Sequence, residues 1–247
     1  MIVLPMAGLS ARFAKAGYAA PKYMLPLGGR SVFAHALASF EALFDAERFV
    51  IVCRDVAGTA EFVRAQCAAL GVARLDLVVL ERETAGQAET VAEGLRRAGA
   101  AGAAPLTIFN IDTFRPGFRH PASFDAGSVD GYLEVFRGPG THWSFVRPDP
   151  GDPGAFRAAE VAEKIRISDL CSTGLYHFRR AGDFLSLYVP AAAADPATLQ
   201  GGERYVAPLY NAAIARGMDI RYALVSREQV RFCGTPEEYE ALRAGCV

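Results

Sequence analysis

The sequence predicts an α/β protein built on a doubly wound, mainly parallel sheet. Three observations support this prediction: short β-rich runs alternate with longer helical patterns, the composition is that of a folded core, and the length suits one α/β domain. The chain has 247 residues, of which 51% are hydrophobic and 21% are charged. That composition excludes disorder, and α/β chains of ~200–250 residues often form a single domain. We therefore expect one domain over residues 1–247.

The first half of the chain carries the alternating pattern. Buried strands are expected at residues 2–6, 49–53, 75–81 and 106–111. Apolar residues at helical spacing predict helices over 31–44, 59–70 and 87–98, the first with Ser31 as its N-cap. Strands joined by helices of this length are parallel, and their right-handed crossovers cover both faces of the sheet.

The pattern changes after Asp112, where Gly and Pro become frequent. Further strands are expected at 131–136, 142–146, 174–178 and 220–225, with a polar loop at 147–154. Helices are expected at 182–188, at 204–216 and from 236 onward. Because short strands follow one another here, we expect antiparallel additions. The expected fold is a three-layer, Rossmann-like α/β sandwich with a mixed, mainly parallel sheet.

Charge and hydropathy exclude several classes of protein. The chain has 26 Lys and Arg against 27 Asp and Glu, so a nucleic-acid protein with a broad basic face is not expected. The longest uncharged apolar run lies between Arg97 and Asp112, which is shorter than the ~20 residues of a membrane helix. The five cysteines are scattered and odd in number, and the first residues do not read as a signal peptide. We expect a cytoplasmic protein in a reducing compartment.

The loop after the first strand is the first candidate site. Ligands of parallel sheets bind beyond the carboxyl ends of the strands. The small residues of this loop let backbone N–H groups approach phosphate oxygens, and Arg12 adds a bidentate donor. Lys22, on a Pro-stiffened segment, is a second cation. The alternative is a tight strand-to-helix turn with two solvated basic residues.

The order AGLSARF, PKYMLPLGG and then a helix resembles the sugar-phosphate nucleotidyltransferases, also called nucleotide-diphospho-sugar pyrophosphorylases, in a short single-domain form. The chain departs from the family at Ser10, where a second glycine is usual, and at Ala11, where Thr or Ser is usual. The resemblance implies the nucleotide-diphospho-sugar transferase fold, with a nucleotide-binding half at 1–115 and an acceptor-binding half at 116–247. It also implies transfer of a nucleoside monophosphate from an NTP to a phosphorylated acceptor, expected to be a sugar phosphate, with release of pyrophosphate.

The resemblance assigns roles residue by residue. It makes Arg12, Lys22 and Asp112 catalytic, with Asp112 also the ligand of Mg²⁺. The implied nucleotide-binding residues are Ala7, Gly8, Leu9, Ser10, Glu81, Thr84, Gly86, Gln87 and Asn110. The implied acceptor-binding residues are Gly131, Glu163, Lys164, Thr173 and Gly174.

Each assignment has a plainer alternative. Asp112 could form an Asx turn, residues 81–87 could be an ordinary strand-to-helix connection, and either Glu163 or Lys164 could be solvated. Phe232 stands where family members often have a second metal-binding Asp.

Two rival functions remain open at this point. One is a glycosyltransferase of the same fold, although Asn110-Ile111-Asp112 lacks the first Asp of an Asp-x-Asp motif. The other is a catalytically silent nucleotide or metabolite sensor, which the departures at Ser10, Ala11 and Phe232 favour. The expected partners are an NTP and a phosphorylated small molecule, with no nucleic acid and no membrane, in a monomer or simple homo-oligomer. Nucleotide-sugar and polysaccharide biosynthesis are the expected pathways.

Overall fold

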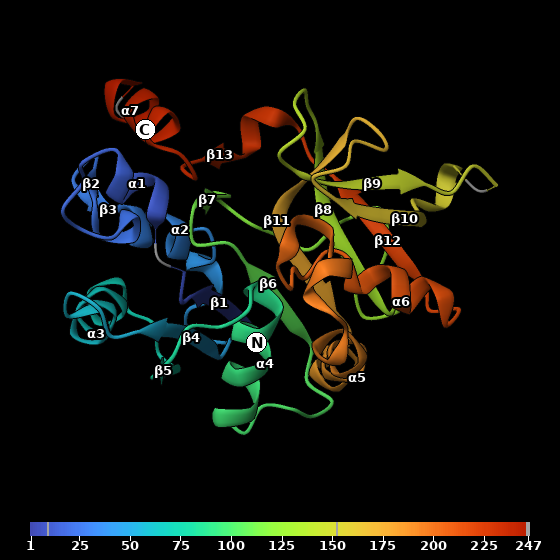
Figure 1. The fold of residues 1–247 in the computed structure, drawn as a ribbon, viewed down its shortest axis with the longest axis horizontal. Helices are drawn as coiled ribbons and strands as arrows, with labels where there is room; N and C mark the ends of the chain where they lie inside the picture. The colour runs from blue at the N-terminus through green and yellow to red at the C-terminus, as the bar shows by residue number, and fades with distance from the viewer. Residues whose placement is uncertain (9, 152, 246–247) are drawn as a thin grey trace.

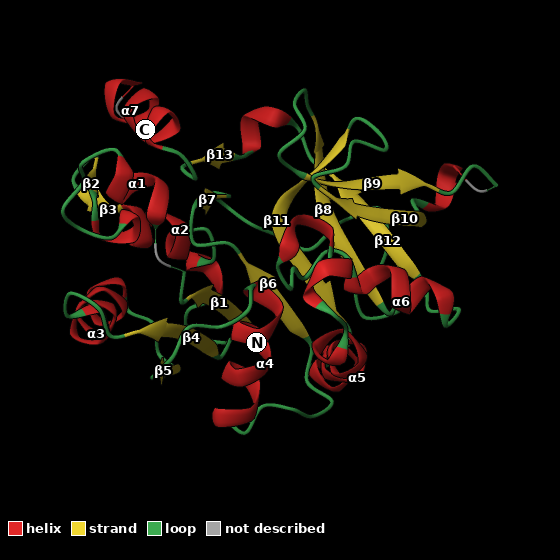
Figure 2. Ribbon diagram, viewed as in Figure 1, coloured by secondary structure: helices red, strands yellow, loops and turns green. Residues whose placement is uncertain are grey.

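Strands and helices alternate along the chain in the computed structural model, which describes residues 1–8, 10–151 and 153–245 (Figures 1 and 2). The strands are β1 (Ile2–Met6), β2 (Pro26–Leu27), β3 (Arg30–Ser31), β4 (Phe49–Arg54), β5 (Leu75–Leu80), β6 (Leu106–Phe109), β7 (Thr113–Phe114), β8 (Gly131–Arg137), β9 (Ser144–Pro148), β10 (Ala158–Glu163), β11 (Leu170–Phe178), β12 (Ile220–Leu224) and β13 (Arg231–Phe232). The α-helices are α1 (Ala11–Lys15), α2 (Val32–Ala38), α3 (Thr59–Leu70), α4 (Gln87–Arg97), α5 (Ala181–Ala193), α6 (Leu209–Ala215) and α7 (Pro236–Gly245).

A central sheet organises these elements, and within the described ranges it has nine strands. Its main path runs β10-β9-β11-β6-β1-β4-β5, with β8 beside β11 and β12 beside β8. The segment β6-β1-β4-β5 is parallel, whereas β11 is antiparallel to β6 and β8, and β9 to β10. The predicted Rossmann-like fold with a mixed sheet and antiparallel additions is therefore confirmed.

Two hydrophobic layers enclose the sheet, because alternate residues of each strand face opposite sides. In β1, Ile2 and Leu4 pack in the layer beneath α2 and α3, whereas Val3 packs in the layer beneath α4, α5 and α6. Figure 2 shows these two groups of helices on either side of the yellow strands. Each fully buried Leu, Ile or Val contributes ~1.5–3 kcal/mol, so these layers hold the strand ends in fixed positions.

The C-terminal helix returns to the N-terminal half of the molecule. In Figure 1 the red α7 lies near the blue α1, away from α5, α6 and β12. Tyr239 of α7 packs edge-on against Phe13, with ring centroids 6.1 Å apart, and its hydroxyl donates to the carbonyl of Pro26 at 2.7 Å. The last elements of the chain, β13 and α7, therefore pack against elements of the N-terminal half.

Several elements differ from the sequence prediction, and three of these differences have a clear physical reason. The helix predicted over 31–44 ends at Ala38, because Ser39 binds the backbone of Arg115 and Phe118 instead of continuing the helix. The helix predicted from 204 begins at Leu209, because the preceding residues bind another loop. Strand β10 was not predicted, since AAEVAE lacks β-forming residues apart from its valine.

Side-chain amides support the β10 strand on its outer edge. Asn211 accepts from Val161 N at 2.8 Å and donates to Val161 O at 2.6 Å. Gln200 accepts from Glu163 N at 2.8 Å. These contacts satisfy backbone groups that an edge strand leaves unpaired.

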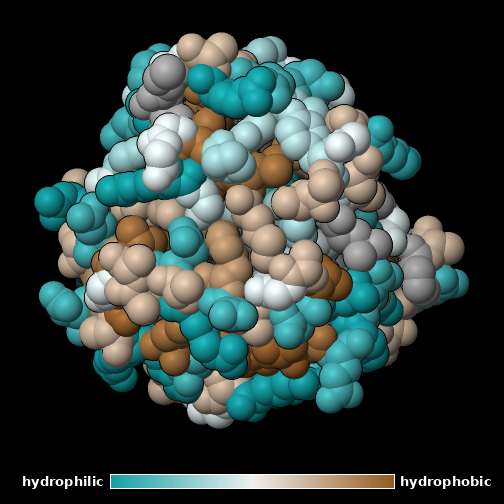
Figure 3. Space-filling model, turned by 90° about the vertical axis from the view of Figure 1, so that its left-hand side faces the viewer, coloured by the Kyte–Doolittle hydropathy of each residue, from teal (hydrophilic) through white to brown (hydrophobic). Residues whose placement is uncertain are grey.

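The surface is mixed in polarity. Figure 3 shows hydrophilic residues over much of one face, with smaller apolar areas between them. In the part of the chain that the structure describes, no helix combines the length and apolar character needed to cross a membrane. Cys53, Cys67, Cys171 and Cys233 are buried free thiols, and Cys246 lies outside the described residues.

The close contact between α4 and β4 gives the first prediction. A Cβ on Gly94 would lie 2.3 Å from Cγ2 of the fully buried Val52, so Gly94→Ala should overpack this layer. We expect a loss of ~1–3 kcal/mol in the free energy of unfolding, measured by urea titration. Gly245→Ala in α7 is the matched control, because nothing lies within 4 Å of its Cβ position. Equal stability of the two variants would contradict the packing argument.

Candidate active site

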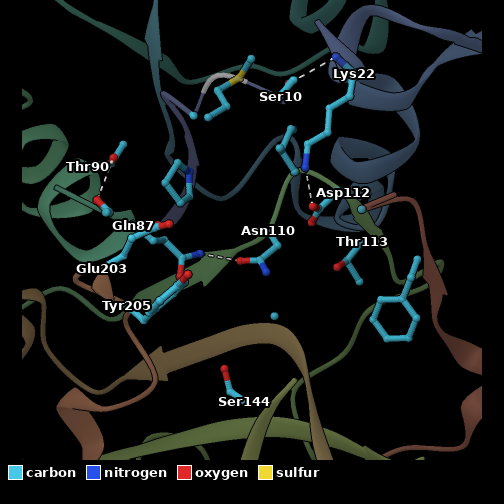
Figure 4. Close-up of a pocket in the computed structure, with 18 of the residues that line it drawn as sticks. Ser10, Lys22, Gln87, Thr90, Asn110, Asp112, Thr113, Ser144, Glu203 and Tyr205 are labelled. Atoms are coloured by element: carbon cyan, nitrogen blue, oxygen red, sulfur yellow. Dashed lines mark hydrogen bonds and ion pairs between the residues drawn. The ribbon is translucent and has the colours of Figure 1, made fainter. Parts of the chain in front are cut away.

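A cleft of ≈ 540 Å³ opens at the carboxyl ends of β1 and β6. Figure 4 shows side chains from the N-terminal half and from the 203–205 segment converging on it. Most of the predicted site residues line this cleft: Ala7, Gly8, Ser10, Arg12, Lys22, Thr84, Gly86, Gln87, Asn110, Asp112, Glu163, Thr173 and Gly174. Leu9 lies outside the described residues.

An ion pair between Lys22 and Asp112 lies at the centre of the cleft. Lys22 Nζ donates to Asp112 Oδ2 at 2.5 Å, and the two residues are 90 positions apart in the chain (Figure 4). Burial by itself would raise the pKa of the Asp112 carboxyl. The charge and hydrogen bond of Lys22, with a smaller effect of Arg12, outweigh burial and lower that pKa below its ordinary value. Asp112 is therefore a carboxylate at neutral pH.

The loop after β1 turns sharply at Ser10. Ser10 adopts a left-handed conformation with φ 52°, which glycine would adopt without strain. It precedes α1, and its hydroxyl accepts a long hydrogen bond from Lys22 N at 3.4 Å. The nucleotidyltransferases that the sequence resembles usually have glycine here, whereas this chain makes the backbone turn with a serine that contacts the Lys22 segment.

The loop before α4 forms a second wall of the cleft. Gln87 Nε2 donates to Asn110 Oδ1 at 2.5 Å, and the hydroxyls of Thr84 and Thr90 are 2.6 Å apart. Gly174 lies opposite, where a Cβ would come within 2.5 Å of Asn110 Nδ2. The side-chain amides of Gln87 and Asn110, which could recognise a base, are therefore fixed by their mutual hydrogen bond and by the close approach of Gly174.

The opposite wall combines a carboxylate with hydroxyl groups. Glu163 accepts a hydrogen bond from the hydroxyl of Ser144, which in turn lies 3.4 Å from the hydroxyl of Tyr176. Burial raises the pKa of Glu163, although the Ser144 hydrogen bond opposes the shift. Burial also raises the pKa of Tyr176 to about 12, so this phenol remains a hydrogen-bond donor. This wall can exchange hydrogen bonds with hydroxyl or amine groups of a ligand.

Three predicted residues do not belong to the described lining of the cleft. Glu81 is an exposed residue after β5, two strands away from β1. Gly131 begins β8 and pairs with Phe178; because β8 and β11 are antiparallel, this end lies away from Gly174. This position does not support the predicted acceptor contact of Gly131, which stays a prediction. A Cβ there would lie 2.7 Å from the His177 carbonyl oxygen, which explains the lack of a side chain. Lys164 is exposed and reaches only the edge of the cleft.

A buried ion pair lies behind the cleft wall. Arg115, which follows β7, donates from Nε to both carboxylate oxygens of Glu134 at 3.1 Å. Arg115 is 6% exposed and Glu134 2%. The hydroxyl of Thr173, a lining residue, donates to the same carboxylate at 3.2 Å. This pair therefore connects the strand after Asp112 with the strand that carries Thr173.

The sequence analysis missed several lining residues, among them Ser144, Tyr205 and Glu238. Glu238 accepts hydrogen bonds from the N–H groups of Gly234 and Thr235, at 2.8 and 3.1 Å. The spacing of Thr235 and Glu238 is that of a capping box, so the sequence did contain this signal. Tyr205 ends a Glu-x-Tyr segment, residues 203–205, that resembles one near the pocket of related proteins, so the sequence held a weaker signal for it too.

Phe232 belongs to an aromatic cluster at one side of the cleft. Its ring centroid lies 4.6 Å from that of Trp143 and 5.1 Å from that of Phe136. A Cβ placed on Gly234 would lie 3.2 Å from Asp112 Oδ2 and 3.5 Å from Glu238 Oε2. The carboxylate that shares this part of the cleft with Asp112 is therefore Glu238, six residues after Phe232.

Comparisons with known proteins agree with this geometry. Residues 2–116 match the MobA-like NTP transferase domain family. A nucleoside-diphosphate-sugar pyrophosphorylase from Vibrio cholerae RC9 is 46% identical, with a TM-score of 0.92, over 99% of this chain and 100% of that chain. The protein belongs to the nucleoside-diphosphate-sugar pyrophosphorylase family. It is an enzyme of the nucleotidyltransferase class.

More distant structures share the fold of this nucleoside-diphosphate-sugar pyrophosphorylase family member. The inositol-1-phosphate CTP transferase from T. maritima is 16% identical with a TM-score of 0.72, over 99% of this chain and 94% of that chain. A UDP-glucose pyrophosphorylase is 15% identical with a TM-score of 0.74, over 99% and 97%. No curated protein sequence matches the chain.

The buried Arg115–Glu134 ion pair gives the second prediction. Arg115→Met leaves Glu134 buried without its cation, which should cost ~3–5 kcal/mol of unfolding free energy. Because burial raises the folded pKa of this carboxyl, the stability of the variant should fall as the pH rises above ~4.3, the ordinary Glu value. Urea titrations between pH 4 and 8 measure both effects.

The double variant Arg115→Met/Glu134→Leu is the control, since it removes both charges. It should recover much of the lost stability and show no such dependence on pH. A double variant as unstable as the single one would contradict this account of the pair.

Proposed function

We propose that the enzyme transfers a nucleoside monophosphate from an NTP to a phosphorylated small-molecule acceptor, with a sugar phosphate as the favoured acceptor. An acceptor phosphate oxygen attacks the α-phosphorus, the bond to the bridging oxygen breaks, and pyrophosphate leaves. No covalent enzyme intermediate is needed. The protein's contribution is positioning and charge neutralisation.

One observation carries this proposal: Arg12, Lys22 and Asp112 converge in a single cleft although they come from three separate segments. Lys22 is the residue proposed to bind the α-phosphate, and Arg12 the leaving pyrophosphate. A charge-assisted hydrogen bond contributes ~1.5–3 kcal/mol. Loss of either cation should therefore slow turnover by roughly one to two powers of ten.

A divalent cation fits the residues present, and we propose Mg²⁺. Mg²⁺ is held in proteins by one or two carboxylates together with substrate phosphates. Asp112 would hold the ion, and Glu238 faces the same glycine. The described residues contain no cluster of three or more His, Cys, Asp or Glu suited to a metal, so the remaining ligands would be triphosphate oxygens and water. When bound, the ion would neutralise phosphate charge.

The acceptor end supports a ligand with a phosphate and several hydrogen-bonding groups. The Glu163 carboxylate and the hydroxyls of Ser144 and Tyr176 can bind hydroxyls or amines, and Lys164 at the rim is suited to the phosphate. An acceptor of this kind has the polarity of a hexose phosphate.

The third prediction tests Asp112. Purified enzyme is incubated with Mg²⁺, each of CTP, UTP, dTTP, GTP and ATP, and either glucose 1-phosphate or glycerol 1-phosphate, and pyrophosphate is measured. Wild type should release pyrophosphate with at least one pair. Asp112→Ala should abolish this release, because the variant loses both the partner of Lys22 and the proposed metal ligand.

Asp76→Ala is the matched control. Asp76 lies on β5, outside the cleft, and forms an ion pair with Arg48. This variant should retain wild-type turnover. Full activity of Asp112→Ala would remove Asp112 from the mechanism. Failure of the wild-type enzyme to release pyrophosphate with any of these pairs would contradict the proposed nucleotidyl transfer.

A further inference from the structure

The backbone of Lys164 is fixed, whereas its long side chain carries the positive charge on a flexible chain of methylene groups. It directly follows β10, with a left-handed φ of 56°, and its N–H donates to the Trp143 carbonyl at 2.9 Å. The backbone is thereby fixed while the side chain extends from an exposed turn. A free lysine side chain loses rotamer entropy when a ligand immobilises it. A contact that immobilises it beforehand would favour ligand binding.

Tyr205 makes that contact. Lys164 Nζ donates to the Tyr205 hydroxyl at 2.5 Å and lies 4.5 Å from the centroid of its ring. Cation–π attraction operates at distances up to ~6 Å. Tyr205 also lines the cleft, so the ammonium is held at the edge of the cavity.

The neutral character of Tyr205 matters because carboxylates surround Lys164. Glu163 and Glu203 both line the cleft. Burial raises the pKa of Tyr205, and the charges of these two carboxylates raise it further, although the hydrogen bond from Lys164 opposes the shift. A carboxylate paired with Lys164 would neutralise its charge and compete with a phosphate. A phenol and its ring hold the ammonium without neutralising it.

The backbone beside Tyr205 is attached to the loop before α4. Arg204 N donates to Ala85 O, and Ala88 N donates to Arg204 O, both at 2.8 Å. The two segments of this contact approach so closely that a Cβ on Gly86 would lie 2.6 Å from Arg204 N. The position of Tyr205 is therefore set by the same loop that carries Gln87, visible beside it in Figure 4.

We infer that Tyr205 is a positioning residue that holds the Lys164 ammonium at the acceptor end of the cleft, ready for the phosphate of the acceptor. The inference rests on the proposed nucleotidyl transfer for its catalytic consequence, but the contact itself can be tested without turnover. Through the Arg204 backbone, the loop expected to bind the nucleotide also fixes the acceptor-binding cation.

The fourth prediction concerns kinetics with the acceptor phosphate that supports turnover of wild type, glucose 1-phosphate or glycerol 1-phosphate. Tyr205→Leu removes both ring and hydroxyl and should raise the KM for the acceptor roughly 10-fold, with the KM for the NTP unchanged. Tyr205→Phe keeps the ring and should raise the acceptor KM only ~3-fold. In a Lys164→Met background, Tyr205→Leu should have almost no further effect, because its action passes through Lys164.

A second measurement is independent of catalysis. Reductive methylation followed by mass spectrometry should modify Lys164 several-fold faster in Tyr205→Leu than in wild type, with Lys15 of α1 as the internal reference. Phe124→Leu is the matched control, since it removes a ring that faces Arg221 at 5.5 Å outside the cleft. It should leave Lys164 labelling and both KM values unchanged.

The outcomes separate the two proposals. A wild-type enzyme that releases no pyrophosphate with any pair would overturn the proposed function, while the labelling result would still decide whether Tyr205 holds Lys164. Unchanged labelling of Lys164 in Tyr205→Leu would overturn the inference. So would a Tyr205→Leu effect on acceptor KM that persists in full in the Lys164→Met background, because Tyr205 would then act by another route.

Discussion

The parallel pairing of β1 with β6 is the constraint on which the site depends. Ile2 and Val3 pair with Thr107 and Ile108, so the two strands end at the same edge of the sheet. The loop that precedes α1 follows β1, and Asp112 follows β6. Only this register allows the Lys22–Asp112 ion pair to close across the cleft at 2.5 Å. Slipping by one residue would turn the apolar side chains of a strand to the opposite layers, so core packing enforces the register.

The wall of the cleft that carries Glu163 and Thr173 is organised by polar contacts rather than by apolar packing alone. The buried Arg115–Glu134 pair connects the segment after Asp112 with Thr173 of β11. Side-chain amides from outside the sheet complete the unpaired edge of β10, the strand that ends at Glu163. Buried polar groups of this kind are costly unless satisfied. Their satisfaction fixes the position of this wall of the cleft.

The two ends of the cleft are mechanically connected. The backbone contact of Arg204 with residues 85–88 gives the loop before α4 and the segment that carries Glu203 and Tyr205 a common position. Gly86 is required for this approach, since any side chain there would meet the Arg204 backbone. Gly86, which the family resemblance assigns to nucleotide binding, therefore also holds the segment that carries Glu203 and Tyr205 in place.

The sequence by itself determined the parallel half of the fold and several of the segments that supply residues to the cleft. Strong apolar runs and helical periodicity located β1, β4, β5, β6, α3 and α4, because these signals are local. The motifs of residues 7–12 and Lys22, with Asp112 at a strand end, identified side chains that share one cleft. Tertiary structure alone decided the rest. Strand β10 forms through β9, Asn211 and Gln200 rather than through its own propensity, and the antiparallel direction of β8 moves Gly131 away from the site. Tyr205 and Glu238 reach the cleft through contacts with distant segments, and no local pattern specifies the distance between such segments in space.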